Sequence, residues 1–336
     1  MKQKIKRQVE PIMIDKYGRN IDYLRISLTD RCNLRCIYCM PEDGVKSLSH
    51  AEILTYDEIL RICRCGAELG IHKIKLTGGE PLVRKGCAGL AGQIKAIPGI
   101  EKVTLTTNGI LLEKQLDDLL KAGIDAINIS LDTLDPELFK KVARRDDLDK
   151  VLKGIEVALT HPGLSLKINS VPVIKEKENF IAVAGLAKKY PIHVRFIEMM
   201  PIGYGKQFPF QDEESIKAVL EEAYGPMHAV KERYGNGPCH YYEIVGFKGK
   251  IGFISAMTHK FCNQCNRVRL TSEGFMKGCL QYQEGTDLRG LMRGGCTDQE
   301  LKEAIYQVIW NKPVSHNFYE AKTAQDEIRG MSQIGG

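Results

Sequence analysis

The chain has 336 residues, of which 43% are hydrophobic, and its 48 Lys and Arg residues exceed its 42 Asp and Glu residues to give a net charge of +6. This length and apolar content support two domains with cores of their own, and they exclude a disordered chain or a small disulfide-stapled scaffold. The charge excess suits an anionic small substrate but is too weak to indicate nucleic acid. The sequence contains no run of eighteen apolar residues, so it predicts no membrane-spanning helix.

Cysteine is the most informative residue type, with eleven copies. An odd number cannot pair completely in disulfides, and the basic N-terminal segment leads into no apolar secretory region. We therefore expect a cytoplasmic chain whose cysteines are thiols or metal ligands. Six of them form two groups. The remaining ones, which we interpret as small buried hydrophobic residues, are Cys63, Cys65, Cys87, Cys239 and Cys296.

Segments rich in β-branched residues alternate with amphipathic helical patterns over the first 205 residues. Thr55, with Glu58 three positions later, forms a capping box that predicts the start of the first helix. Leucine repeats predict further helices over residues 112–120 and 148–159. Such alternation is typical of a parallel sheet with right-handed crossovers. The expected strands are Tyr23–Leu28, Lys73–Thr77, Val103–Thr107, Ala126–Leu131, Leu166–Val171 and His193–Glu198.

Polar motifs in this part of the chain lie at or just beyond the carboxyl ends of the expected strands. A cysteine group follows the first strand, residues 77–81 (Thr-Gly-Gly-Glu-Pro) follow the second, and residues 106–109 (Thr-Thr-Asn-Gly) close the third. The carboxyl ends of barrel strands converge on one mouth, whereas a flat sheet spreads them along an edge. The pattern therefore favours an α/β fold with a partial (β/α)6 barrel over a doubly wound open sheet.

The pattern changes beyond about residue 205. A Gly/Pro-rich stretch precedes short strand candidates and two helix candidates, which indicates a smaller α+β cap domain. We predict a barrel domain over residues 1–205, the C-terminal cap domain over 206–324, and a flexible Gly-rich tail over 325–336. The expected helices are Glu213–Tyr224 and Asp298–Trp310, and the expected strands are Tyr241–Val245, Ile251–Ile254 and Arg267–Thr271.

The first cysteine group, Cys32, Cys36 and Cys39, has the spacing C-x3-C-x2-C. Ferredoxin-type runs supply four cysteines to a [4Fe–4S] cluster, so three would leave one iron open to a non-protein ligand. The alternatives are a zinc site completed by a distant histidine, or thiols without metal. Tyr38 and the Gly-Gly-Glu-Pro turn extend the pattern, and together these features resemble the radical S-adenosylmethionine superfamily. In that family the cluster binds S-adenosylmethionine and gives a 5′-deoxyadenosyl radical.

The Gly-Gly-Glu-Pro turn has its own expected contacts. Gly78 and Gly79 would let the backbone approach the amino-acid part of S-adenosylmethionine without interference from a Cβ atom. Glu80 either accepts from the ammonium group of that cosubstrate or braces the turn.

The second cysteine group, Cys262, Cys265 and Cys279, has the spacing C-x2-C-x13-C. His259 lies three residues before Cys262, so this spacing alone leaves a zinc site and an iron–sulfur cluster about equally supported. Arg267 and Arg269 lie two positions apart and therefore share one face of a strand. Guanidinium groups that face a cavity suit phosphate or a base edge, while a solvated strand face is the alternative.

The whole chain is similar to the GTP 3′,8-cyclase family, also called molybdenum cofactor biosynthesis protein A. The likeness runs from Asp15–Arg19 through LRISLTDRCNLRCIYCMPEDGV, KIKLTGGEPLVR, LTTNG, INISLDTLDP, RFIEMMPIG and FCNQCNRVRLTSEG to the terminal Gly-Gly. The resemblance implies a lyase that converts GTP to (8S)-3′,8-cyclo-7,8-dihydroguanosine 5′-triphosphate, the first step of molybdenum cofactor biosynthesis.

The resemblance also implies site residues. The first cysteine group would hold the cluster that binds S-adenosylmethionine, and the second would hold an auxiliary [4Fe–4S] cluster whose open iron receives guanine. Gly335 and Gly336 would enter the barrel and take part in catalysis. Contacts to S-adenosylmethionine are expected from Tyr38, Gly79, Ser130 and Met200. Contacts to GTP are expected from Arg25, Lys73, Lys75, Thr106, Lys167, Arg195, Arg267, Val268 and Arg269.

The partners implied by the resemblance are GTP, a reductant such as flavodoxin, a second copy in a homodimer, and a downstream cyclic pyranopterin monophosphate synthase. Lys75 stands where arginine is common in the family, and its ammonium group is a point charge, whereas a guanidinium group can donate two parallel hydrogen bonds. A peptide-modifying radical S-adenosylmethionine enzyme would share the first cysteine group without the terminal Gly-Gly. A zinc-binding nucleic-acid module would leave the strand-end motifs unexplained, and an electron-transfer ferredoxin would need four-cysteine ligation.

Overall fold

The computed structural model describes residues 12–46, 48–320 and 326–335. Over these residues it contains one sheet in the order β12-β11-β10-β1-β2-β3-β4-β5-β6-β9-β8-β7. The six central strands run parallel, and the edge strands β12 and β7 do not meet, which confirms the partial barrel. These central strands are β1 (Tyr23–Ser27), β2 (Lys73–Thr77), β3 (Lys102–Thr107), β4 (Ala126–Ser130), β5 (Ser165–Ser170) and β6 (His193–Ile197).

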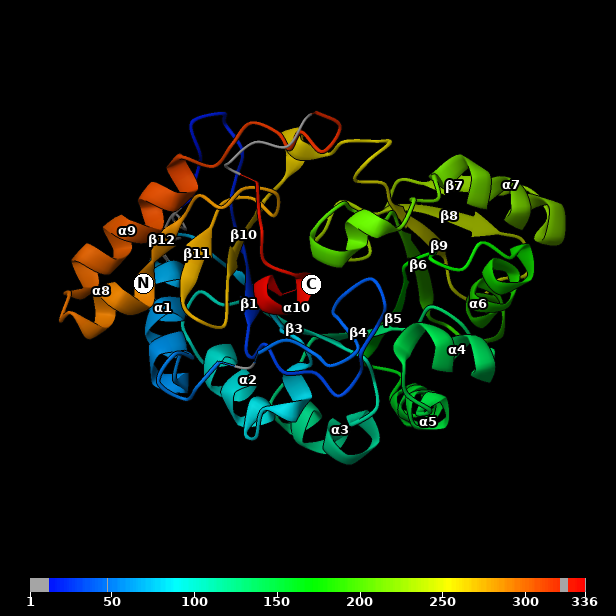
Figure 1. Cartoon of the computed structure of the whole chain (residues 1–336), viewed down its shortest axis with the longest axis horizontal. Helices are drawn as coiled ribbons and strands as arrows, with labels where there is room; N and C mark the ends of the chain where they lie inside the picture. Colours follow the sequence, from blue (N-terminus) through cyan, green and yellow to red (C-terminus); the bar gives the residue numbers. More distant parts are fainter. Residues whose placement is uncertain (1–11, 47, 321–325, 336) are drawn as a thin grey trace, which may run out of the picture.

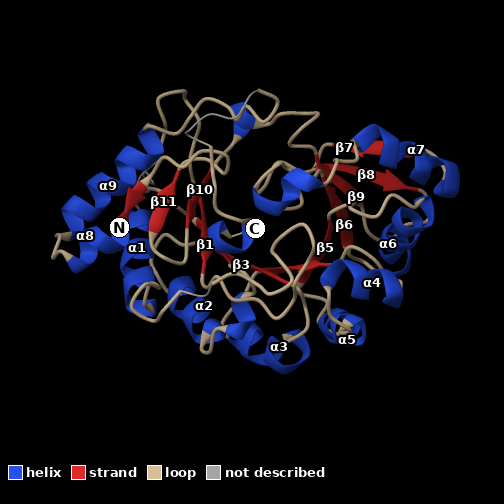
Figure 2. Cartoon of the chain, viewed as in Figure 1, coloured by secondary structure: helices blue, strands red, loops and turns tan. Residues whose placement is uncertain are grey.

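Helices cover the outer face of the curved sheet, as Figures 1 and 2 show. Leu112, Leu116 and Leu119 on α3 are fully buried, so the predicted leucine stripe packs into the core. Within the described residues, no helix is both long enough and apolar enough to span a membrane. The helices of this half are α1 (Tyr56–Glu68), α2 (Cys87–Lys95), α3 (Leu112–Lys121), α4 (Pro136–Ala143), α5 (Leu148–Leu159) and α6 (Lys177–Lys189), with the 3-10 helices η1 (Pro81–Val83) and η2 (Gly203–Gln207).

The C-terminal part of the chain lengthens the same sheet at both edges. Strand β9 (Ile251–Ile254) pairs in parallel with β6, and β10 (Arg267–Leu270) pairs in parallel with β1. The chain therefore crosses from one edge of the half-barrel to the other, and the domain boundary at residue 205 stays a prediction. The other elements are α7 (Glu213–Tyr224), β7 (Met227–Val230), β8 (His240–Ile244), η3 (Cys262–Gln264), β11 (Phe275–Lys277), β12 (Thr286–Asp287), α8 (Leu288–Arg293), α9 (Asp298–Trp310) and α10 (Met331–Ile334).

The predicted capping box is present at the start of α1. The Glu58 N–H donates to Thr55 Oγ1 at 3.2 Å, and the Thr55 N–H donates to Glu58 Oε2 at 2.7 Å. Thr55→Ala should destabilise the fold by about 1 kcal/mol, because the first turn loses its side-chain acceptor. Urea unfolding under anaerobic conditions measures the shift in midpoint. Thr55→Ser keeps the acceptor and serves as the control, so equal midpoints for the two variants would contradict a capping role.

Candidate active site

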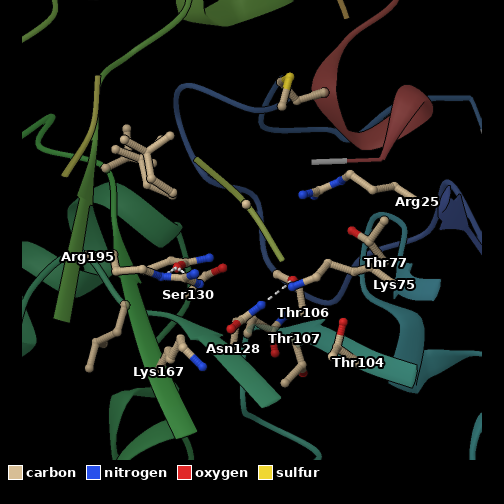
Figure 3. A pocket seen from close by; sticks show the side chains of 18 of the residues that line it. Arg25, Lys75, Thr77, Thr104, Thr106, Thr107, Asn128, Ser130, Lys167 and Arg195 are labelled. Carbon is tan, nitrogen blue, oxygen red and sulfur yellow. Dashed lines mark hydrogen bonds between the residues drawn. The ribbon is translucent and has the colours of Figure 1, made fainter. Parts of the chain in front are cut away.

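A cavity of about 660 Å³ lies inside the half-barrel. Its wall comes from the inner faces of β1 to β6, the first cysteine group, residues 233–238 between β7 and β8, and Met331 of α10. Figure 3 shows Arg25 and Lys75 on one side of the cavity, Lys167 and Arg195 on the other, and Asn128 and Thr106 between them. Loops and strands far apart in sequence thus share one chamber.

Strand register aligns cations on one wall of this chamber. Arg25 on β1 lies opposite Lys75 on β2 and Arg269 on β10. Alternate residues of a strand face opposite sides, so the intervening Leu24 and Ile26 are buried against the helices. Burial, and then the charges of Arg25 and Arg195, hold the pKa of Lys75 well below its ordinary value. A polyanion in the cavity would relieve this crowding of positive charge.

A second pair of cations lies on β5 and β6. Arg195 donates from Nε to Asn169 Oδ1 at 2.9 Å, and Lys167 donates from Nζ to Ser165 Oγ at 2.8 Å. Burial, and next the charge of Arg195, lower the pKa of Lys167 to about 8. Between the two groups, Asn128 Nδ2 donates to Thr106 Oγ1 at 3.3 Å (Figure 3). The cavity thus offers cations on both sides of a strip of neutral polar groups.

The first cysteine group follows β1 and lines the same cavity. Burial raises the pKa of Cys32 to about 11 and that of Cys39 to about 12. Burial and the charge of Asp132 raise the pKa of Cys36 most. Cys39 and Cys32 raise it further, so the three thiols lie close together. Backbone N–H groups of Leu34 and Ser332 donate to Cys32 Sγ and Cys39 Sγ. Neighbouring thiols that accept from N–H donors fit the ligation of a metal cluster by thiolates.

The glycines of residues 77–81 pack closely against the backbone of the chain itself, and Gly78 and Gly79 also line the cavity. The Gly79 N–H donates to Thr29 O at 2.6 Å, and a Cβ atom on Gly79 would lie only 2.4 Å from Arg31 O. A Cβ atom on Gly78 would lie 2.6 Å from Thr29 O. The turn therefore needs glycine because it packs against the backbone that leads into Cys32.

Glu80 braces this turn. It accepts from Thr107 Oγ1 and from the Asn108 N–H, both at 2.7 Å, and from the Leu82 N–H at 3.0 Å. Burial raises the pKa of Glu80 to about 7. Of the two expectations for this carboxyl group, the structure shows the bracing contacts. Asn108 Nδ2 also lies 3.8 Å from Cys32 Sγ, so the brace extends to the cysteine group.

Tyr38 is joined to Asp132, one of the polar residues at the strand ends, to which the sequence patterns assigned no role. The Tyr38 hydroxyl donates to Asp132 Oδ2 at 2.7 Å, and the Val171 N–H donates to Asp132 Oδ1 at 2.8 Å. Burial raises the pKa of Asp132 to about 6. Its place just beyond the end of β4, two residues after Ser130, was the available signal. Tyr38, Gly79, Ser130 and Met200 all line the cavity.

The second cysteine group lies outside the cavity lining, around η3 and after β11. Burial acts to raise the pKa of Cys265, but the charges of Arg267 and Lys312 outweigh it and lower that pKa to about 6. Its thiol is therefore ready to act as a thiolate ligand. His259 Nδ1 lies 3.7 Å from Glu213 Oε2. Among the described residues, no three His, Cys, Asp or Glu side chains surround a position for a single metal ion.

Several expected nucleotide contacts do line the cavity, and two do not. Val268 is fully buried between Arg267 and Arg269, facing the helix side of β10. Lys73 pairs with Asp22 Oδ2 at 2.5 Å at the amino end of β2. The expected contacts that line the cavity are Arg25, Lys75, Thr106, Lys167, Arg195, Arg267 and Arg269. Sequence patterns missed residues 233–238, although their Gly-Asn-Gly-Pro run was an available loop signal.

The C-terminal tail enters the half-barrel, where Figure 1 shows α10 at the centre. Ser332 and Ile334 are buried, and Met331 lines the cavity. Arg269 Nη1 donates to Gly335 O at 2.7 Å. Gly336 lies outside the described residues. The tail thus contacts Arg269, one of the residues expected to bind GTP.

Comparison with known proteins places this site in a family. Residues 26–184 match the Radical SAM superfamily, and residues 192–318 match Molybdenum Cofactor Synthesis C. A GTP 3′,8-cyclase of Clostridium perfringens (strain SM101 / Type A) is 48% identical over 326 residues, which cover 96% of this chain and 100% of that protein. This chain belongs to the GTP 3′,8-cyclase family. Another member, from Syntrophomonas wolfei, is 46% identical over 329 residues, with the same coverage of both chains.

Solved structures share the fold at low sequence identity. SuiB of Streptococcus suis bound to its precursor peptide SuiA aligns with a TM-score of 0.61 and 16% identity, covering 89% of this chain and 67% of that one. SuiB bound to S-adenosylmethionine aligns with a TM-score of 0.60 and 18% identity, covering 90% and 67%. The predicted radical S-adenosylmethionine fold is confirmed for this GTP 3′,8-cyclase family member.

Proposed function

We propose that this chain catalyses the GTP 3′,8-cyclase reaction, the first step of molybdenum cofactor biosynthesis. The observation that carries the proposal is one cavity lined both by three neighbouring, partly buried thiols and by buried cations. Similarity over nearly the full length to GTP 3′,8-cyclases supports it. The conversion joins C3′ of GTP to C8 of guanine. It removes one hydrogen atom from C3′ and returns one electron and one proton.

The cations are proposed to bind the triphosphate. Arg25 and Lys75 on one side, with Lys167 and Arg195 on the other, would hold the phosphate oxygens by charge-assisted hydrogen bonds. Thr106 and Asn128 lie between them and offer neutral polar contacts to the ribose. Fixing the triphosphate and the ribose orients C3′ toward the cysteine group and keeps the reacting atoms close.

The first cysteine group fits a [4Fe–4S] cluster with one iron left open for S-adenosylmethionine. When bound, the cluster and S-adenosylmethionine together would supply the one-electron chemistry that removes hydrogen from C3′. The chain's own residues hold the thiols in place through the Leu34, Asn108 and Ser332 donors. Tyr38 is oriented by its hydrogen bond to Asp132. We propose contacts to S-adenosylmethionine from Tyr38, Gly79, Ser130 and Met200, all of which line the cavity.

We further propose that Cys262, Cys265 and Cys279 hold an auxiliary [4Fe–4S] cluster. Burial raises the pKa of Cys262, and the nearby Cys279 and Cys265 raise it further, so the three thiols lie near one another. Arg267, whose guanidinium lies 5.0 Å from the centre of the Phe261 ring, lines the cavity and also acts on the Cys265 thiol, so it links this group to the cavity. We also propose a cytoplasmic location, a flavodoxin as reductant, a homodimer, and delivery of product to a cyclic pyranopterin monophosphate synthase.

The direct test is anaerobic incubation of the chain with GTP, S-adenosylmethionine and dithionite. We expect 5′-deoxyadenosine and, after workup, a fluorescent pterin, together with about eight irons per chain for two four-iron clusters. Omission of GTP is the control for uncoupled cleavage. Bound zinc without the visible absorption of an iron–sulfur cluster would refute the proposal and favour the zinc-module alternative.

Loss of the Lys167 charge predicts a pH effect on GTP use. Because burial, and then Arg195, lower the pKa of Lys167 to about 8, the side chain is cationic below that pH and neutral above it. We expect kcat/KM for GTP to fall as pH rises through about 8, by about 10-fold or more from the lost charge-assisted bond. Lys167→Arg keeps its charge throughout and should abolish this fall. An unchanged profile in that variant would assign the titration to another group.

A further inference from the structure

The C-terminal tail is held at its start by a buried ion pair. Glu327, near the beginning of the described tail, pairs with Lys277 at the end of β11, and the two side chains are 1% and 0% exposed. Arg329 reaches back from the tail to the same carboxylate, with Nε 2.9 Å from Glu327 Oε1. Its Nη1 lies 2.6 Å from Glu273 Oε1, in a pair that is partly exposed. Glu327 is therefore the shared acceptor of two cations.

Backbone and amide contacts fix the same point. The Glu327 N–H donates to Gln281 O at 2.5 Å, and Asp326 forms an antiparallel bridge with Tyr282. Gln281 Nε2 donates to Asp326 Oδ1 at 3.1 Å. The tail thus starts from the segment that follows Cys279, beside the second cysteine group.

The other end of the tail lies against the first cysteine group and the expected nucleotide site. The Ser332 N–H donates to Cys39 Sγ, and Gly335 O accepts from Arg269. Only a short segment separates Glu327 from Gly335, and its reach is limited by the length of the chain. Where the tail is anchored therefore decides where its last residues lie.

We propose that Glu327 and Lys277 are positioning residues for the C-terminal glycines. Their buried pair fixes the point at which the tail enters the cavity and so places Gly335 at Arg269. A buried ion pair is weak evidence for stability, because desolvation offsets the attraction of the charges, so a role in specifying geometry suits it better. The link to cyclisation rests on the proposed function, whereas the docking of the tail does not.

Glu327→Gln tests the anchor, because it keeps the shape of the side chain and removes its charge. We expect trypsin to cleave after Arg329 in this variant and not in the wild type, which intact-mass spectrometry detects without any activity. GTP cyclisation should fall about 100-fold, as for a misplaced catalytic segment, while iron per chain stays at the wild-type level. Glu273→Gln, which removes the outer pair, should have a small effect on both measurements.

Glu68→Gln is the matched control, since Glu68 pairs with Lys302 at 2.9 Å between α1 and α9, away from the tail. If Glu327→Gln fails to fold, the Lys277→Met/Glu327→Met double variant removes both charges and leaves none unpaired. A protected tail and normal cyclisation in either Glu327 variant would overturn the proposal. If the wild type cyclises no GTP, the proposed function fails, and tryptic protection of the tail still decides whether the anchor exists.

Discussion

Cys36→Ala is expected to abolish formation of 5′-deoxyadenosine and to remove about four irons per chain, the content of one cubane cluster. The partly buried Cys36 thiol lies near Cys39 and Cys32, and all three cysteines line the cavity. Alanine offers no ligand, so two thiols would remain for a cluster that needs three protein ligands. Iron and sulfide analysis of anaerobically purified protein measures the loss, and chromatography of the nucleoside measures cleavage.

Cys63→Ala is the matched control for this prediction. Cys63 is buried on α1 and packs in the core between helix and sheet, where burial raises the pKa of its thiol to about 12. We expect wild-type iron content and cyclisation, with somewhat lower stability from the small cavity left behind. A Cys36→Ala protein that kept all its iron and still cleaved S-adenosylmethionine would remove the first cysteine group from the proposed cluster site.

Local patterns predicted the central fold well because each element repeats a simple period. The helices Glu213–Tyr224 and Asp298–Trp310 were expected with those bounds and are found with them. The strands β7, β11 and β12 were missed; β11 and β12 have only three and two residues, too few to show alternation, and β7 has one buried residue among its four. The pairing of β10 with β1 joins residues far apart in sequence, and no local pattern carries such information.

The candidate site was predictable where residue type and strand position agree. Lys75, Lys167 and Arg195 lie on strands that were expected, and alternation turns them into the cavity. The contacts of Glu80 with Thr107 and Asn108 were not predictable, because these donors lie at the end of β3 and meet Glu80 only in the folded sheet. The role of Asp132 could not be predicted from its position at the end of a strand, since its partner Tyr38 comes from a distant loop.

Deletion of Gly335 and Gly336 is expected to abolish cyclisation and to leave iron per chain unchanged. Gly335 lies in the left-handed region, with φ of 78°, and a Cβ atom there would be 3.0 Å from Ser27 Cβ and 3.2 Å from Thr77 Cγ2. Its carbonyl oxygen accepts from Arg269. The deletion removes this acceptor from a crowded part of the site without touching any cysteine. Pterin fluorescence after workup and iron analysis measure the two results separately.

Single substitutions separate crowding from backbone strain at the tail. Gly335→Ala and Gly295→Ala both place a side chain at a positive φ, of 78° and 87°, but a Cβ atom on Gly295 meets nothing within 4 Å. Both variants should lose some stability, because alanine is strained in this region, and Gly335→Ala should lose more because its methyl group is also crowded. Only Gly335→Ala should lose cyclisation, because only there does the added methyl group meet Ser27 and Thr77. Full turnover by the truncated chain would show that the contact between Gly335 and Arg269 is structural, and that the tail has no part in the reaction.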